Sequence, residues 1–89
     1  MANSTKGSVS MTLKEAMEGK EYIIENISTH DEELETFLFS LGCYSGESIF
    51  VTTQLRNGCI ITIKNSRYHI DTPLAKAITI HQPEGGITV

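Results

Sequence analysis

The chain has 89 residues, of which 39% are hydrophobic and 20% are charged, and its formal net charge is −4. A chain of this length forms one domain and leaves no room for a separate catalytic domain. No apolar run is long enough to cross a bilayer, and the polar first ten residues lack the hydrophobic segment of a signal peptide. The negative charge argues against binding to nucleic acid phosphates. We therefore expect an intracellular protein whose partners are not nucleic acids.

The first part of the chain predicts a leader, a short helical turn and a strand. Residues 1–10 lack large apolar side chains and are expected to form a disordered leader. Thr12 with Glu15 fits a capping box, which predicts one helical turn ended by Gly19. A strand is expected at Glu21–Ile27. Its alternation is imperfect because two isoleucines are adjacent, so we expect both faces to be partly buried.

A one-sided helix is predicted between Asp31 and Gly42. Asp31 suits the N-cap, and the helix dipole favours the glutamates of the first turn. Gly42 can adopt the left-handed conformation that ends a helix, and Gly46 suits a tight turn before the next strand. Apolar residues recur at three- and four-residue spacing on one face, which we expect to be buried. The residues of this face are Leu34, Phe37, Leu38 and Leu41.

Two strand-like runs, Ser48–Leu55 and Cys59–Lys64, are separated by three residues, Arg56, Asn57 and Gly58. With Asn57 and Gly58 at its centre, a type I′ turn would join the two strands, and this is the strongest hairpin signal in the sequence. The predicted cross-strand pairs are Leu55 with Ile60, Gln54 with Ile61 and Thr53 with Thr62.

The next segment predicts a second turn at Asn65 and Ser66, followed by a strand at Arg67–Asp71. Pro73 breaks this strand, because proline cannot donate a ladder hydrogen bond. A short connection is then expected at Leu74–Lys76.

The end of the chain predicts a final strand at Ala77–His81 and a flexible tail at residues 82–89, which contain a proline and two glycines. The expected total is five short strands with one helix inserted after the first. Short strands in so small a domain usually close into a barrel, because closure removes exposed strand edges. The helix can then cap one open end of the barrel.

The sequence contains no sign of catalysis. Cys43 and Cys59 form no CxxC or metal-knuckle spacing, and neither has a histidine at a motif spacing. No glycine-rich phosphate-binding loop occurs. We expect the two cysteines to be free, partly buried thiols and the protein not to be an enzyme.

Several short motifs resemble the FeoA family, the small cytosolic SH3-like barrels associated with bacterial ferrous iron uptake. The first two are the family's opening turn and its helix-to-strand junction, in which a leucine-glycine pair is followed by a second glycine. The others are the hairpin glycine Gly58, the central strands and an isoleucine-rich closing strand. Ser45 stands where the family usually has a proline. The matching segments are Leu13–Gly19, Leu38–Gly46, Tyr68–Ile70 and Ala75–Ile80.

The resemblance implies a mainly β, SH3-like barrel over residues 11–81 and a non-enzymatic accessory role in ferrous iron uptake. The implied partner is the cytosolic GTP-binding region of a membrane Fe(II) transporter, which would keep this cytoplasmic chain at the inner membrane without inserting it. An effect on GTP hydrolysis and a weak homodimer stay open. The expected docking surface comprises Phe39, Cys43, Tyr44 and Asn57.

The three junction residues have structural alternatives. Tyr44 could fold over the barrel end, and Cys43 could fill a small gap in the core. Phe39 lies off the apolar face of the helix, so it makes either a second contact with the barrel or an exposed contact for a partner.

The same barrel also occurs as the C-terminal domain of metal-dependent repressors, which suggests a metal-sensing module as a second hypothesis. The candidate ligands are His30, before the helix, and His69 with Asp71, which share one face of a strand. Two ligands rarely hold a metal unless others converge on it. The alternative is that all three side chains are solvated. We therefore expect no required cofactor and at most weak Fe2+ binding.

Overall fold

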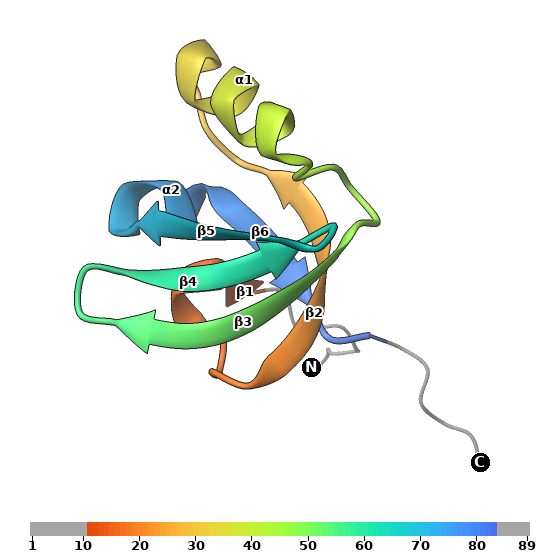
Figure 1. Cartoon of the computed structure of the whole chain (residues 1–89). Helices are drawn as coiled ribbons and strands as arrows, with labels where there is room; N and C mark the ends of the chain where they lie inside the picture. The colour runs from red at the N-terminus through yellow and green to blue at the C-terminus, as the bar shows by residue number, and fades with distance from the viewer. Residues whose placement is uncertain (1–10, 84–89) are drawn as a thin grey trace, which may run out of the picture.

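The computed structural model describes residues 11–83, which form one antiparallel sheet with a helix rising from it (Figure 1). The strand order is β1-β6-β2-β3-β4-β5. The sheet thus contains the five expected strands and one additional strand of two residues, β1. The expected leader, residues 1–10, and most of the expected tail, residues 82–89, lie outside the described residues. The elements are β1 (Met11–Thr12), the 3-10 helix η2 (Leu13–Glu15), β2 (Lys20–Ile27), α1 (Glu32–Leu41), β3 (Ser48–Leu55), β4 (Gly58–Ile63), β5 (Ser66–Asp71), α2 (Thr72–Ala77) and β6 (Ile78–His81).

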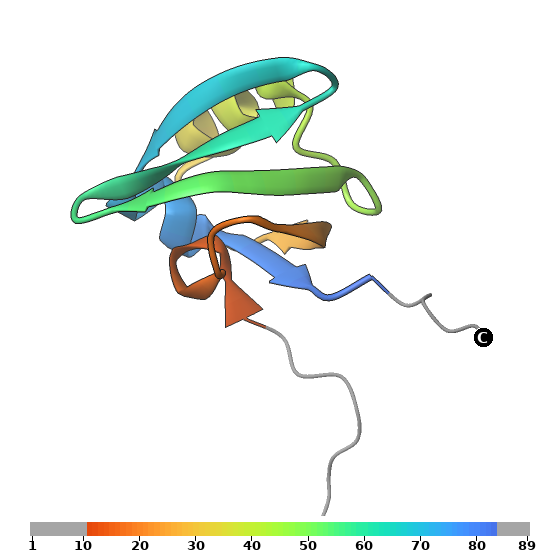
Figure 2. The ribbon, with the colours of Figure 1, turned by 60° about the horizontal axis from the view of Figure 1, so that its bottom comes forward.

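The sheet curls on itself, so that β3, β4 and β5 face β1, β2 and β6 (Figure 2). Two irregularities in strand register contribute to this curl. One lies in β2 between Ile24 and Asn26, and the other lies in β3 between Val51 and Thr53. Bulges of this kind bend a strand and increase its twist. The result is the mainly β, SH3-like architecture that the sequence predicted.

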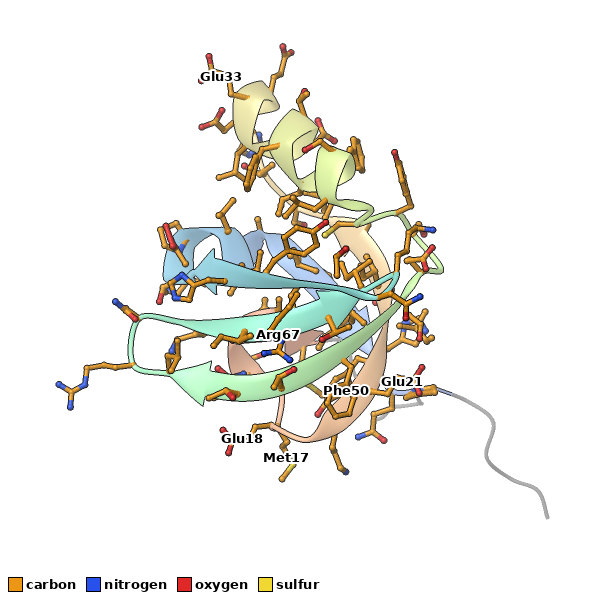
Figure 3. The ribbon with its side chains drawn as sticks, in the orientation of Figure 1. Met17, Glu18, Glu21, Glu33, Phe50 and Arg67 are labelled. Atoms are coloured by element: carbon orange, nitrogen blue, oxygen red, sulfur yellow. The ribbon has the colours of Figure 1, made fainter. Side chains whose placement is uncertain are left out.

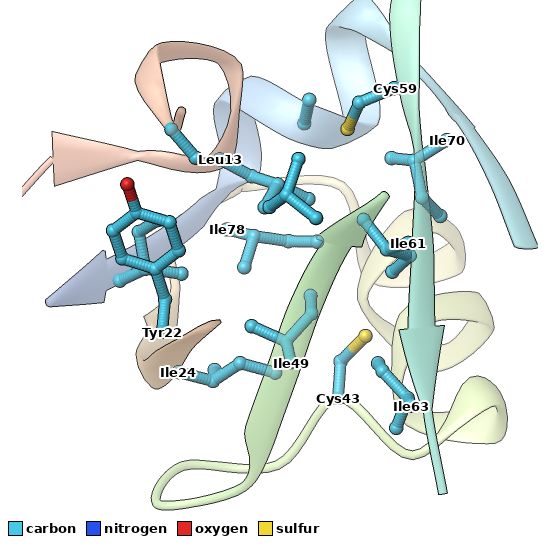
Figure 4. Packing of buried hydrophobic residues seen from close by; sticks show 14 of the residues in the cluster. Leu13, Tyr22, Ile24, Cys43, Ile49, Cys59, Ile61, Ile63, Ile70 and Ile78 are labelled. Carbon is cyan, nitrogen blue, oxygen red and sulfur yellow. The ribbon is translucent and has the colours of Figure 1, made fainter. Parts of the chain in front are cut away.

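The apolar core fills the space between the two halves of the curled sheet (Figure 4). In β2, Tyr22 and Ile24 are buried while Ile23 between them is half-buried, which confirms that both faces of this strand are partly covered. The Tyr22 hydroxyl accepts a hydrogen bond from the backbone N of Met17 at 3.0 Å, so its polar end is satisfied inside the core. The largest fully buried side chains are Tyr22, Leu13, Ile24, Leu38, Ile49, Ile61, Ile63, Ile70, Ile78, Ile80, Val51 and Cys43.

The short helical turn at the beginning of the described chain is present as η2. The backbone N of Thr12 donates to Oε1 of Glu15 at 2.9 Å, which is the contact from Glu15 expected of a capping box. Gly19 does not end this helix, because η2 already stops at Glu15. Gly19 instead has a left-handed φ of 82° and directly precedes β2.

The segment expected as a connection after Pro73 is a helix, α2. Pro73 lies in its first turn, where a backbone N–H would have no helical partner, so proline begins this helix as well as ending β5. The last strand consequently starts at Ile78 and not at Ala77, which is the final residue of α2. No helix within residues 11–83 combines the length and hydropathy needed to span a membrane.

The β3–β4 hairpin exists, but its predicted register is wrong. The central residues of the turn are Arg56 and Asn57, and neither has a positive φ, so the turn is not type I′. Gly58 is the first residue of β4, and a Cβ there would lie 2.1 Å from the carbonyl oxygen of Ile70 on β5. Glycine is therefore required by the neighbouring strand and not by the turn. The observed pairs are Leu55 with Gly58, Gln54 with Cys59 and Thr53 with Ile60.

The turn with two left-handed residues occurs one hairpin later, between β4 and β5. Lys64 and Asn65 have φ values of 51° and 68° and stand between the paired residues Ile63 and Ser66. Positive φ at both central positions is the mark of a type I′ turn. The predicted turn at Asn65 and Ser66 was therefore one residue too late.

Helix α1 begins and ends where the sequence predicted. The Asp31 side chain accepts hydrogen bonds from the backbone N of Glu33 and Leu34, and Gly42 closes the helix with a left-handed φ of 101°. The expectation of a fully buried apolar face is wrong, because Phe37 is 48% exposed while Leu38 is fully buried. The reason is visible in Figure 1: the C-terminal end of α1 lies next to the sheet, and the N-terminal end of the helix extends away from the sheet.

Candidate functional site

The segment between α1 and β3 is fixed against β2 by backbone hydrogen bonds. The N of Gly46 donates to the carbonyl oxygen of Ile24 at 2.7 Å, and the N of Ile24 donates to the carbonyl oxygen of Glu47 at 2.9 Å. At the other end, the N of Cys43 donates to the carbonyl oxygen of Leu38 in α1 at 3.1 Å. Residues 42–47 are therefore held from both sides, which gives their side chains a defined direction.

Ser45 adds a further anchor. Its Oγ donates to the carbonyl oxygen of Glu25 on β2 at 2.8 Å. This is the position where the resemblance led us to expect a proline, whose ring would preset φ. Here a hydrogen bond between side chain and backbone supplies the restraint instead, and it ties the same turn to β2.

Two aromatic rings meet where α1 passes into this segment. Phe39 and Tyr44 stack with their ring centroids 5.4 Å apart and their planes 8° apart. Phe39 is half-buried, whereas Tyr44 is 51% exposed. Tyr44 is therefore displayed to solvent and does not fold into the barrel end, and Phe39 supports its ring.

A groove of about 460 Å³ lies beside this pair, and we call it the aromatic groove. One side comes from the end of β2, and the other from α1 and the segment that follows it. Sequence reasoning found only the two aromatic residues of this site. Glu35 carried a usable signal, since it precedes Phe39 by four residues and so shares its helix face. The groove is lined by Asn26, Ile27, Glu35, Phe39, Tyr44 and Ser45.

Cys43 does not belong to the exposed surface, which corrects its assignment to the docking surface. Its side chain is fully buried, and burial raises the pKa of the thiol to about 11. Cys59 is also buried, and burial raises its pKa although nearby Lys14 opposes the shift. Both cysteines are free, as expected, and their thiols are protonated at neutral pH. A protonated, buried thiol is a poor nucleophile.

Asn57 is exposed at the tip of the β3–β4 turn, away from the aromatic groove. Figure 1 places this turn at the opposite end of β3 from the segment that carries Tyr44. Because β3 has eight residues, the two sites are separated by roughly 26 Å of extended strand. The structure thus brings Phe39 and Tyr44 together and leaves Asn57 elsewhere.

The three candidate metal ligands are all exposed. His69 and Asp71 share the outward face of β5, on either side of the buried Ile70, and His30 precedes the N-cap of α1. Within the described part of the chain, no three or more His, Cys, Asp or Glu side chains gather in a way that could hold a metal ion.

A second apolar feature lies on the outer face of the sheet, where Met17 is 60% and Phe50 is 41% exposed. Phe50 is paired with Glu21 on β2, and its other neighbour in the ladder, Thr62, is paired with Arg67 on β5. Figure 3 shows Met17, Glu18, Glu21 and Phe50 gathered at the same side of the sheet. This surface therefore mixes apolar groups with charges of both signs.

Both the fold and the sequence resemble those of known proteins. A crystal structure of the iron uptake regulatory protein FeoA superposes with a TM-score of 0.75 and 26% identity, over 82% of this chain and 97% of that one. FeoA from Stenotrophomonas maltophilia, solved in complex with zinc, gives a TM-score of 0.71 and 17% identity over 79% of this chain and 88% of that one.

A larger protein shares the same barrel. A manganese-dependent transcriptional repressor gives a TM-score of 0.77 and 17% identity over 83% of this chain, but over only 42% of the repressor. A search of curated proteins finds no match. The model of the FeoA domain matches residues 11–82 of this sequence. The chain therefore belongs to the FeoA domain family.

Proposed function

We propose that this protein is a non-enzymatic accessory protein of ferrous iron uptake, which docks through the aromatic groove on the cytosolic GTP-binding region of a membrane Fe(II) transporter. The observation that carries the proposal is the exposed Tyr44 ring held against Phe39 on a segment bonded to β2. A rigid aromatic side chain beside a groove is the kind of anchor that protein interfaces favour. Membership of the FeoA domain family and the likeness to an iron uptake regulatory protein support the same role.

Docking is tested by isothermal titration calorimetry between the purified chain and the soluble GTPase domain of the transporter from the same organism. Tyr44→Ala should weaken binding at least about tenfold, since truncation of an interface anchor typically costs about 2 kcal/mol or more. Phe50→Ala, which truncates an exposed aromatic residue on the outer face of the sheet, is the matched control and should leave binding unchanged. Absence of both heat and co-elution at high protein concentration would count against docking. Equal losses in both variants would exclude the groove as the docking face.

A second candidate function is divalent metal binding, in support of sensing or transport. It is favoured by the zinc complex of the Stenotrophomonas maltophilia FeoA and by the manganese-dependent repressor that shares the barrel. In this chain, His69 and Asp71 are the pair on one strand face that could begin such a site. Anaerobic Fe2+ titration of the isolated protein, with His69→Ala beside it, tests this function. Retention of no metal by the wild-type protein after gel filtration would dismiss it.

A further inference from the structure

The part of the chain that builds the aromatic groove is strongly acidic. Residues 21–55 contain seven aspartates and glutamates but no lysine or arginine. All six residues that line the groove lie within this stretch. One of the acidic residues, Glu35, lines the groove itself, one helical turn before Phe39. The groove therefore combines aromatic and apolar side chains with polar ones, in a stretch of chain whose aspartates and glutamates are not balanced by any lysine or arginine.

Two basic side chains approach this region, and each lies beside a carboxylate. Lys64 Nζ lies 3.2 Å from Glu47 Oε1, and His81 Nδ1 lies 3.9 Å from Glu25 Oε1. Neither of these two side chains lines the groove. The carboxylate of Glu35 is therefore the charge in the groove that a bound segment meets. Glu33 lies at the far end of the same helix, as Figure 3 shows.

The exposed tyrosine adds a second preference for positive charge. The face of an aromatic ring carries negative electrostatic potential, and a guanidinium group stacks on it through its flat face. One face of Tyr44 is taken by Phe39, and the side chain keeps half of its surface in solvent. Arginine suits such a site better than lysine, because its planar group can stack on the ring and donate to a carboxylate at once.

We propose that the aromatic groove receives an arginine-bearing segment of the docking partner. The guanidinium group lies over the free surface of Tyr44 and donates to the Glu35 carboxylate, while a neighbouring apolar side chain rests on Ile27. This inference rests on the proposed docking function and specifies the chemistry of the segment that docks.

The other exposed apolar surface does not carry the same preference. Around Met17 and Phe50, the acidic Glu18 and Glu21 lie on the same side of the sheet, but Arg67 belongs to the same cross-strand row. Charges of both signs give no selection for a cationic partner. Glu18 therefore offers a control position: it is an exposed glutamate outside the groove.

The proposal is tested with a short peptide probe and 15N NMR of the isolated full-length chain. The probe is the blocked pentapeptide Gly-Leu-Arg-Leu-Gly, and its partner has citrulline, the neutral isostere of arginine, in the third position. The arginine peptide should shift the backbone signals of Asn26, Tyr44 and Ser45. The citrulline peptide should bind about tenfold more weakly, because it loses both the ion pair and the cation–aromatic contact. Equal binding of the two peptides, or no shift up to about 5 mM peptide, would overturn the proposal.

Two substitutions locate the preference for charge. Glu35→Gln should weaken the arginine peptide about threefold and leave the citrulline peptide unaffected, as expected for one partly exposed ion pair. Glu18→Gln removes the same charge elsewhere and should change neither affinity. Tyr44→Leu keeps the apolar bulk but removes the ring face, and it should reduce the difference between the two peptides to the roughly threefold that the Glu35 ion pair contributes. Persistence of the full difference in both groove variants would contradict the assignment.

The same variants separate this inference from the docking function on which it rests. If the GTPase domain binds the wild type and Glu35→Gln equally well, the arginine assignment fails while docking stands. If the arginine peptide binds as described but the GTPase domain does not, the groove chemistry stands and the proposed partner is wrong.

Discussion

Gly58 and Ile70 approach each other so closely that a Cβ on Gly58 would stand 2.1 Å from the Ile70 carbonyl oxygen. The contact joins two neighbouring strands, β4 and β5, through backbone atoms that no rotamer change can move. Gly58 also has a positive φ of 154°. Any side chain at this position must therefore push the two strands apart.

Gly58→Ala is accordingly expected to lower the free energy of unfolding by at least about 3 kcal/mol, from overpacking together with backbone strain. Gly19→Ala is the matched control. Gly19 has a left-handed φ of 82°, but a Cβ there meets nothing within 4 Å, so only about 1 kcal/mol should be lost. Chemical denaturation of both variants measures the difference. Equal losses would mean that the close approach of the strands relaxes without cost.

The partial burial of α1 predicts unequal effects at adjacent residues. Leu38→Ala should cost about 2–5 kcal/mol of stability, because it empties a fully buried position. Phe37→Ala should cost less than about 1 kcal/mol, because Phe37 is 48% exposed. Thermal and urea unfolding of the two variants provide the measurement. A large loss at Phe37 would show that this side of α1 is covered in solution.

The N-cap of α1 is expected to contribute a modest, local stability. Asp31→Ala removes the acceptor for the backbone N of Glu33 and Leu34 and should cost about 1 kcal/mol. Asp31→Asn retains a capping oxygen and should lose only part of that amount. Amide hydrogen exchange in the first turn of α1 should be slowest in the wild type, faster in Asp31→Asn and fastest in Asp31→Ala. If alanine and asparagine behave alike, the cap has no energetic role here.

Burial of Cys43 predicts a loss of stability at high pH. The thiol has a pKa of about 11 in the folded chain and an ordinary value of 9.0, so the unfolded chain ionises first as the pH rises. The contribution of the protonated Cys43 thiol to the free energy of unfolding is fully present below pH 9.0 and is lost progressively as the pH approaches 11.

The melting temperature should thus fall more steeply above pH 9.0 in the wild type than in Cys43→Ala, which lacks the ionisable group. The variant is expected to be less stable at every pH, since it loses buried volume. The slope of melting temperature against pH, and not its absolute value, is therefore the readout. Parallel slopes would show that the thiol titrates normally in the folded chain.

Local chemistry predicted both ends of α1. Asp31 and Gly42 bracket α1 because a cap and a left-handed glycine act within a few residues of sequence. The Asn57-Gly58 pair misled the register for the opposite reason. The need for Gly58 comes from Ile70, twelve residues further along the chain, and no local turn preference can report a contact between non-adjacent segments.

The candidate site shows the same division. Tyr44 was identified because glycines on either side of its short segment display it, which is a local property. Asn26 and Ile27 were missed, since they reach the groove only through the attachment of the 42–47 segment to β2. The buried position of Cys43, next to an exposed tyrosine, likewise depends on how the chain turns after Gly42 and not on residue type.

Because α1 contacts the sheet over only part of its length, its core residues and its exposed acidic residues lie in different parts of the helix. Leu38 anchors the helix from its C-terminal half, whereas the first-turn positions that carry the acidic side chains add nothing to the core. Substitutions at these acidic positions can therefore change the charge of this part of α1 while the barrel still folds. We propose that proteins built in this way can diverge in recognition faster than in architecture, so that exchanging these acidic residues between two of them would exchange their binding preference.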